Sequence, residues 1–184
     1  MDIEKIKKYT KTPIYYYKEI NSTHVYGKQI EGQGDAILIA EAQTAGIGTK
    51  GRNWHTGENK NIAMTIIKHP NVKIEKLNGL TVEIAKKIKK IIKEMYDYDL
   101  KIKEPNDLML NGKKISGILT ESHTRGENVA FLLISIGFNV NETEFSEETK
   151  EIATSLKKEY KKEFNREEII IKIIKNIEEI IEQL

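Results

Sequence analysis

The sequence predicts an α+β fold with a mixed, mostly antiparallel sheet and packed helices. Short segments rich in β-branched and aromatic residues occur in groups, and two long segments repeat isoleucine at helical spacing. Along the chain, strands come first, followed by a long helix, a meander of strands and a last helix. This order differs from the repeated strand–helix units of parallel α/β folds.

The first third of the chain contains three expected strands. Residues 14–20 are rich in tyrosine and isoleucine, and residues 35–42 are so apolar that we expect them to be buried on both faces. Between them, Asn21, Ser22 and Thr23 are expected to cap a helix over residues 25–30, which Gly32 and Gly34 end. A glycine-rich loop over residues 46–51 precedes the third strand, residues 61–68.

The middle of the chain predicts a helix and a hairpin. Apolar residues recur at helical spacing from Leu77 to Met95, which predicts an amphipathic helix over residues 74–96. After a short extended segment, residues 100–103, the pair Asn111-Gly112 predicts a hairpin between residues 108–110 and 114–121. Strict alternation in its second strand would place Lys114, Ser116 and Ile118 on one face, opposite Ile115, Gly117 and Leu119.

The rest of the chain completes the sheet and adds a helix. Residues 122–128 are expected to form a turn, and residues 129–138 return as a strand. The isoleucine stripe that begins at Ile169 and runs to Leu184 predicts a final helix packed on the core.

Length and composition indicate one ordinary globular domain. The chain has 184 residues, 39% of them hydrophobic, with a formal net charge of +2. That charge does not call for nucleic acid or an anionic membrane surface as a partner, and no apolar run approaches the length of a membrane span. The sequence contains no cysteine and begins without a signal-peptide core, so we expect a cytoplasmic protein without disulfides or thiolate chemistry.

The first candidate site lies in residues 43–54. Three glycines within six positions allow the backbone to turn tightly and to bring its N–H groups to an anion. Arg52 can grip a phosphate or carboxylate with its planar fork, and Trp54 can stack on a purine. Spacing alone is equally consistent with a mobile surface loop closed by a buried tryptophan.

Two further segments carry candidate polar groups. Residues 103–107 read Lys-Glu-Pro-Asn-Asp, and Lys114 follows on a strand where it can project into a cleft. Residues 135–141, at the end of a strand, bring a glycine and two asparagines together. Taken singly, Pro-Asn-Asp and Asn-Gly are also good turn sequences, and that structural interpretation is strong for each.

In this order and spacing, the segments resemble the catalytic domain of the biotin protein ligases. That family shows Ser-Thr after its first strand, then Gln-x-x-Gly-Arg-Gly-Arg-x-Gly-Arg-x-Trp, Lys-Trp-Pro-Asn-Asp, Lys-x-x-Gly-Ile-Leu-x-Glu and Gly-x-Gly-x-Asn-x-Asn. Here the corresponding segments are Ser22-Thr23 and residues 43–54, 103–107, 114–121 and 135–141, and residues 153–156 match the segment before the last helix. The resemblance covers the chain from about residue 14 onward.

The resemblance implies a class II synthetase-like catalytic fold and a reaction in two steps. Biotin attacks the α-phosphate of ATP to give biotinyl-adenylate and pyrophosphate, with Mg²⁺ accompanying ATP. A lysine amine of a biotin carboxyl carrier domain, part of a biotin-dependent carboxylase, then attacks the adenylate. The resemblance leaves a homodimer open.

The resemblance also assigns roles to individual residues. Lys114 and Arg52 are the expected catalytic residues, with Lys114 offsetting the charge that builds as two anions meet. The biotin site is expected to contain Ser22, Thr23, His24, Gln43, Ile47, Gly48, Thr49, Lys114 and Gly117. The ATP and adenylate site is expected to contain Gly46, Lys50, Gly51, Arg52, Trp54, Lys103, Asn106, Asp107 and Asn139, with Asp107 also meeting Mg²⁺.

The chain departs from the family pattern in the glycine-rich loop and before Pro-Asn-Asp. Ile47 and Thr49 replace two loop arginines, and Glu104 replaces the tryptophan before Pro-Asn-Asp. We expect residues 1–184 to form a single catalytic domain, without the N-terminal DNA-binding domain or the small C-terminal β-domain of some members, and we expect no DNA role. A ligase for another carboxylate such as lipoate, or a degenerate domain that only binds biotin or an adenylate, is the alternative interpretation.

Overall fold

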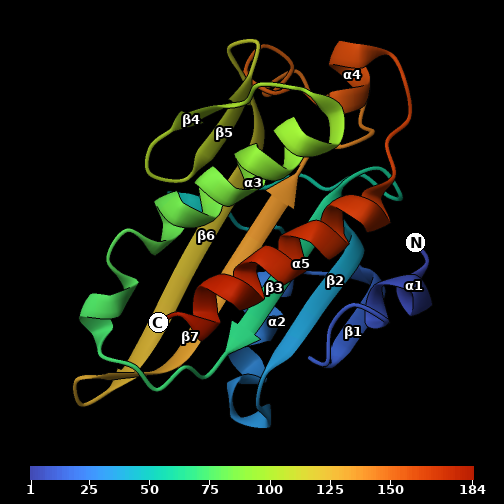
Figure 1. The fold of residues 1–184 in the computed structure, drawn as a ribbon. Coiled ribbons are helices and arrows are strands. Elements are labelled where there is room, and N and C mark those ends of the chain that lie inside the picture. Colours follow the sequence, from blue (N-terminus) through green and yellow to red (C-terminus); the bar gives the residue numbers. More distant parts are fainter.

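The computed structural model describes residues 1–184, the side chain of Glu31 excepted, and contains one seven-stranded sheet (Figure 1). Its strands are β1 (Ile14–Ile20), β2 (Ala36–Gln43), β3 (Ile62–Lys68), β4 (Lys101–Lys103), β5 (Asp107–Leu110), β6 (Lys113–Arg125) and β7 (Asn128–Phe138). They lie in the order β1-β2-β3-β7-β6-β5-β4. Only the β1–β2 pair is parallel among these strands, which confirms the predicted mixed, mostly antiparallel sheet.

Helices cover both faces of this sheet. The long helices α3 (Leu80–Tyr96) and α5 (Arg166–Glu182) lie side by side on one face, where their isoleucines form the main core with the strands (Figure 1). The short helix α2 (Thr23–Gln29) packs on β2, β3 and β7 over a smaller apolar cluster that includes Leu38, Ile67 and Leu133. Two short helices, α1 (Ile3–Lys7) and α4 (Leu156–Tyr160), complete the fold, and neither was predicted.

The start of the first long helix differs from the prediction. Residues 74–96 do not form one helix, because Ile74–Leu77 form a separate 3₁₀ turn, η3, and α3 begins at Leu80. Between them Gly79 has φ of 80°, a left-handed conformation that glycine adopts without steric cost but that no α-helix accommodates. The apolar stripe continues through this break, so periodicity alone could not reveal it.

The turn of the β6–β7 hairpin is shorter than predicted. Residues 122–128 are not a turn, because β6 runs to Arg125 and β7 already begins at Asn128. His123 pairs with Phe131 across the ladder. The tip of β6 is polar and exposed, so its sequence carries no apolar alternation to mark it as a strand.

A β-bulge overturns the predicted alternation in β6. Leu108 pairs with Ser116 but its neighbour Met109 pairs with Lys114, which leaves Ile115 as an extra residue on β6. The bulge shifts the side-chain alternation by one position. Lys114 therefore lies on the same side as Gly117, with its Cε only 3.2 Å from where a Cβ on Gly117 would be, and not on the opposite face.

The second helix begins as expected of a capped helix. Ser22 has an extended backbone, and its hydroxyl accepts a hydrogen bond from the Val25 N–H at 3.5 Å. The helix starts at Thr23 and ends at Gln29, and a 3₁₀ turn, η1 (Glu31–Gln33), follows before β2. This arrangement fixes Thr23 and His24 in the first turn, where both are buried. Across residues 1–184 we find no helix long and apolar enough to cross a membrane.

Candidate active site

Two adjoining cavities lie at one end of the central strands. The first, of about 420 Å³, is lined by α2, the ends of β2, β3, β6 and β7 and the glycine-rich loop. Every residue that the resemblance assigned to the biotin site lines this cavity. The second, of about 750 Å³, opens between the loop and the segment that follows β7. Gly48, Thr49, Trp54 and Lys114 line both cavities, so they mark the boundary between them.

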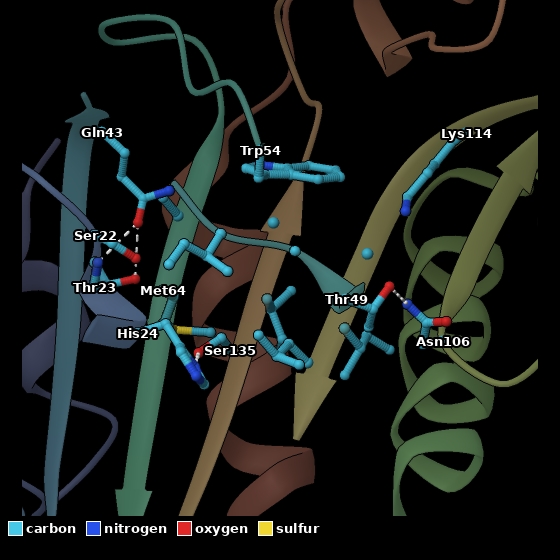
Figure 2. Close-up of a pocket in the computed structure, with 18 residues that line it drawn as sticks. Ser22, Thr23, His24, Gln43, Thr49, Trp54, Met64, Asn106, Lys114 and Ser135 are labelled. Carbon is cyan, nitrogen blue, oxygen red and sulfur yellow. Dashed lines mark hydrogen bonds between the residues drawn. The ribbon is translucent and has the colours of Figure 1, made fainter. Parts of the chain in front are cut away.

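Hydrogen-bonding side chains gather at the inner end of the first cavity. The Gln43 Oε1 atom accepts hydrogen bonds from the Thr23 N–H at 2.9 Å and from the Thr23 hydroxyl at 3.1 Å. Figure 2 shows Ser22, Thr23 and Gln43 together at this end, with His24 and Ser135 beneath them. The arrangement offers an amide and hydroxyl groups to a polar ring.

Lys114 lies at the opposite end, where the cavities meet (Figure 2). Its Nζ is 2.6 Å from Asp107 Oδ1 and 5.5 Å from the centre of the Trp54 ring, and its side chain is 26% exposed. The segment before α4 holds the backbone of Lys114 in place, because the Lys114 N–H donates to the Ile152 carbonyl at 2.7 Å. A single ammonium group is thus held at a defined point of an otherwise open cavity.

Trp54 lies flat on a shelf formed by Gly117 and Gly137, which face each other across β6 and β7. A Cβ on Gly137 would lie 2.2 Å from Trp54 Cε2, so no other residue leaves room for the indole in this position. The indole Nε1 is buried and has no hydrogen-bond partner among the described residues. The loop is therefore closed by its tryptophan, and this residue separates the two cavities.

The glycine-rich loop bends back over its own arginine. Arg52 donates from Nη2 to the Thr49 hydroxyl at 3.1 Å and from Nε to the Thr49 carbonyl at 3.3 Å. Asn106 donates to the same hydroxyl at 3.4 Å and to Asp107 at 3.0 Å (Figure 2). Thr49 thereby links the loop to the Pro-Asn-Asp turn.

The residues expected at the ATP site are only partly brought together. Arg52, Trp54 and Asn139 line the second cavity, and Asn106 lines the first. Asn139 is buried, and its amide donates to the Thr154 carbonyl at 3.0 Å, so it supports the segment after β7. In contrast, the other expected residues line neither cavity: Gly46, Lys50, Gly51, Lys103 and Asp107. Lys103 is exposed on the outermost strand.

The expected metal ligand is engaged by protein groups. Asp107 pairs with Lys114 and accepts from Asn106. Across the described residues, no group of three or more histidine, cysteine, aspartate or glutamate side chains is placed to hold a metal ion. Besides Asp107, the Glu142 carboxylate lies at the second cavity, where it pairs with Lys60, so both carboxylates are engaged by protein cations.

Sequence reasoning missed several residues behind the cavities. Thr65 and Ser135 hydrogen-bond to each other at 2.8 Å, and Glu121 contacts His24. Burial acts to raise the pKa of the Glu121 carboxyl, but hydrogen bonds from Lys28, His24 and His123 hold that pKa down at about 2. Alternation on β3 and β7 could have pointed to Thr65 and Ser135 as the polar residues of otherwise apolar strands.

Comparisons with known proteins agree on one family. A sequence profile of the biotin/lipoate A/B protein ligase family matches residues 6–141. The bifunctional ligase/repressor BirA of Bacillus subtilis (strain 168) is 32% identical over 166 residues, which cover 88% of this chain and 51% of that protein. The biotin–[acetyl-CoA-carboxylase] ligase of Paracoccus denitrificans is 33% identical over 116 residues, 58% of this chain and 45% of that protein.

A solved structure shows the same arrangement of elements. The biotin protein ligase from Aquifex aeolicus, in complex with biotin and ATP, superimposes with a TM-score of 0.76 at 26% identity. The match covers 93% of this chain and 71% of the other. The chain spans about half the length of the curated relatives it matches, 51% of the Bacillus subtilis protein.

Proposed function

This chain belongs to the biotin/lipoate A/B protein ligase family, and from that premise we propose that it activates biotin with ATP and transfers it to a lysine of a carrier protein. The observation that carries the proposal is the position of Lys114, which lines both cavities. One cavity ends in amide and hydroxyl groups suited to a cyclic urea, and the other is lined by Arg52 and Trp54, which suit a phosphate and a base.

The first step joins two anions, and Lys114 is the group placed to stabilise their approach. A biotin oxygen attacks the α-phosphorus of ATP, the bond to the β-phosphate oxygen breaks, and pyrophosphate leaves. Negative charge is concentrated at that point, and a positioned ammonium in a partly closed cavity stabilises it. Asp107 holds this ammonium, and we propose that Lys114 turns from Asp107 to the reacting oxygens when the substrates bind.

The same exchange gives Asp107 a second role. Once Lys114 has left it, the Asp107 carboxylate would be the group that holds a Mg²⁺ ion accompanying ATP. Arg52, which already borders the second cavity, can move from Thr49 to a phosphate oxygen. These roles make Lys114 and Arg52 the proposed catalytic residues and Asp107 the proposed metal contact.

The second step needs an outside nucleophile. A neutral lysine amine of the acceptor attacks the acyl carbon of the adenylate, loses a proton, and AMP leaves with the bonding electron pair. We propose a biotin carboxyl carrier domain as that acceptor and residues 1–184 as one catalytic unit acting in the cytoplasm. The naming of the Paracoccus denitrificans relative as a ligase for acetyl-CoA carboxylase supports this choice of acceptor.

The test is pyrophosphate release by the purified chain with ATP and biotin, followed by labelling of a carrier domain. We expect pyrophosphate with biotin and little with lipoate, because the polar inner end of the first cavity suits a urea ring and not an apolar dithiolane. Release with lipoate and none with biotin would replace the proposal with the related ligase. Binding of biotin without release of pyrophosphate from ATP would mean that the chain is a binding domain and not a ligase.

A further inference from the structure

Lys114 lies just outside the regular pairing of β6 with β7. That ladder begins at Ser116, which pairs with Phe138, and beyond it the Asn139 N–H still donates to the Ile115 carbonyl at 2.8 Å. On this edge, β7 therefore offers no partner to the backbone of Lys114. The lysine on which the proposed chemistry depends must be fixed by another part of the chain.

The segment before α4, residues 152–154, takes the place of β7 beside Lys114. The Lys114 N–H donates to the Ile152 carbonyl at 2.7 Å, and the Lys114 carbonyl accepts from the Thr154 N–H at 2.9 Å. Between these two bonds, Lys114 forms an isolated parallel bridge with Ala153. The segment belongs to no helix or strand, so its shape depends on the side chains that hold it.

Glu159, in α4, connects this segment to the turn that precedes Lys114. Its carboxylate accepts a hydrogen bond from the Thr154 hydroxyl through Oε1. Through Oε2 it accepts a second one from the side-chain amide of Asn111, in the β5–β6 turn, at 2.6 Å. One carboxylate therefore links the two pieces of chain that flank the lysine.

Glu159 carries the charge that such a link requires. The hydrogen bond from Thr154 lowers the pKa of the Glu159 carboxyl, and burial raises it. The hydrogen bond from Asn111 and the charges of Lys113 and Lys161 lower this pKa further, so the net effect is a lowering. The carboxylate is therefore ionised at neutral pH, and both oxygens act only as acceptors. Thr154 is buried and shielded from water, whereas Asn111 is exposed.

We propose that Glu159 is a positioning residue for Lys114 in the adenylation step, an inference that rests on the proposed function. Neither Glu159 nor its partners Thr154 and Asn111 line either cavity, so Glu159 acts on the reaction through Lys114. It holds the segment and the turn against the lysine backbone, and this places the ammonium where the two anions meet. A small displacement of such a group lowers the rate strongly.

Other contacts keep the segment folded when this carboxylate is removed. The side-chain amide of Asn139 donates to the Thr154 carbonyl at 3.0 Å, and the Leu156 N–H donates to the Asn139 carbonyl at 3.3 Å. We therefore expect a Glu159 variant to keep its fold and both cavities, with a looser backbone at Lys114. Melting curves of each variant check that the folded chain is being measured.

The first test compares kcat and KM for pyrophosphate release from biotin and ATP in the wild type and in Glu159→Ala. We expect kcat to fall about tenfold with little change in KM for either substrate, because the lysine is displaced while the cavities remain. Glu163→Ala is the control, because Glu163 pairs with Lys157 on the exposed surface, and it should keep the wild-type kcat. Equal kcat in the wild type and Glu159→Ala would overturn the proposal.

The second test asks whether Glu159 acts through Lys114. In a Lys114→Ala background, adding Glu159→Ala should cause no further fall in the residual rate, because the positioned group is already absent. The same fall in both backgrounds would show a general structural effect and overturn the positioning role.

The partners of the carboxylate are tested one at a time. Thr154→Val keeps the shape of the side chain without its hydroxyl, and Asn111→Gly keeps the turn, since glycine also adopts the φ of 49° found there. Both should lower kcat, and Thr154→Val should lower it more, because its lost hydrogen bond is the buried one. An unchanged kcat in Thr154→Val would overturn the link through the segment.

Hydrogen exchange of the Lys114 amide measures the same link without any reaction. We expect this amide to exchange faster in Glu159→Ala, while the Ile118 amide, which donates to the Asn106 carbonyl at 2.9 Å, should exchange as in the wild type. Unchanged protection of Lys114 would overturn the proposal. A wild type that releases no pyrophosphate would overturn the ligase proposal and this role in it, whereas wild-type release that Glu159→Ala leaves unaltered would overturn the role alone.

Discussion

Lys114 is the residue on which the proposed chemistry depends most. Its ammonium is held 2.6 Å from Asp107 at the boundary of two cavities, on a strand whose bulge turns it toward Gly117. In the proposed mechanism this ammonium turns from Asp107 to the point where the two anions meet, where it stabilises the developing charge. The bulge is therefore part of the site, because strict alternation would have turned the lysine to the other face.

Replacing this lysine should remove adenylation without unfolding the chain. We expect Lys114→Ala to lower the rate of pyrophosphate release by about a hundredfold, equivalent to about 3 kcal/mol of transition-state stabilisation. The neighbour Lys113, whose Nζ donates to the Lys150 carbonyl, is the matched control, and Lys113→Ala should stay near the wild-type rate. Equal rates for both variants would remove Lys114 from the mechanism.

Trp54 is expected to act mainly on the nucleotide. It borders both cavities, and a base stacked on an aromatic ring contributes about 1–3 kcal/mol. Trp54→Ala should weaken ATP binding more than biotin binding, as measured by calorimetry with each ligand alone. Equal losses for both ligands, with a large fall in melting temperature, would instead make the indole a structural plug on its glycine shelf.

Individual site residues were predictable where motifs are local in sequence. The residues assigned to biotin all line one cavity, because Ser22, Thr23 and Gln43 follow directly on strands that the sequence marks clearly. Thr65 and Ser135 were missed because their meaning arises from pairing: they face each other across β3 and β7. No pattern within either strand states which residue will lie opposite.

Among the elements, we expect the glycine-rich loop to determine how long an adenylate is held. Its threonine accepts hydrogen bonds from Arg52 and Asn106, so it offers the ligand at most a neutral contact where the family pattern has an arginine. Charge-assisted hydrogen bonds contribute about 1.5–3 kcal/mol and neutral ones about 1. We expect the chain to release its adenylate readily.

Restoring the charge tests this expectation. Thr49→Arg should slow the dissociation of preformed biotinyl-adenylate by about tenfold and suppress labelling of a bystander protein. Thr49→Val, which removes the hydroxyl without adding charge, is the control for disturbing the loop. A wild-type complex that already persists through many turnovers without bystander labelling would contradict the expectation and point to Lys50 or Ile47 as the retaining group.

The glycine-rich loop should open when a side chain at position 137 occupies the space of the Trp54 ring. A Cβ on Gly137 would lie 2.2 Å from the indole, and the contacting atoms belong to a rigid ring. Gly137→Ala should therefore displace Trp54, the single tryptophan of the sequence, so that its fluorescence shifts to longer wavelength. Gly32→Ala, at a position where a Cβ meets nothing within 4 Å, should leave the spectrum unchanged. An unshifted spectrum in Gly137→Ala would mean that the loop is not seated on β7.

The boundaries of strands and helices could be predicted where the hydrophobic pattern of the sequence marks the buried residues, and not elsewhere. Strands β2 and β3 are mostly apolar and were placed to within about one residue. The interruption at Gly79 and the polar tip of β6 were missed, because a single dihedral angle and an exposed pairing leave the hydrophobic pattern unchanged.

At the scale of the whole molecule, fold class was predictable from the order of elements, but the order of strands in the sheet was not. In the sheet β3 lies between β2 and β7, although β7 is far from β3 in the sequence. The local sequence pattern of a strand does not specify which other strand will pair with it. The pairing of β3 with β7 is nevertheless what brings Gln43, Ser135 and Gly137 to one cavity.

A buried ion pair fastens the last helix to this sheet. Arg166, in the first turn of α5, donates from Nη1 to Glu41 Oε2 at 2.5 Å, and both side chains are at least 90% buried. The Tyr16 hydroxyl on β1 donates to the same carboxylate at 2.9 Å. Burial acts to raise the pKa of Glu41, but hydrogen bonds from Arg166, the Met1 amine and Tyr16 hold it below its usual value.

Breaking that pair should destabilise the whole fold. Glu41→Gln leaves the Arg166 charge buried without the opposite charge of Glu41, which typically costs about 3–5 kcal/mol in the free energy of unfolding measured with urea. Glu179→Gln, on the exposed face of α5, should cost less than about 0.5 kcal/mol. Because the folded pKa of Glu41 is depressed, its contribution is complete above the ordinary glutamate value of about 4.3 and is lost as pH falls through the folded value. The wild type should therefore lose more stability on acidification than Glu41→Gln does, and parallel losses in the two proteins would show that this carboxylate does not govern acid unfolding.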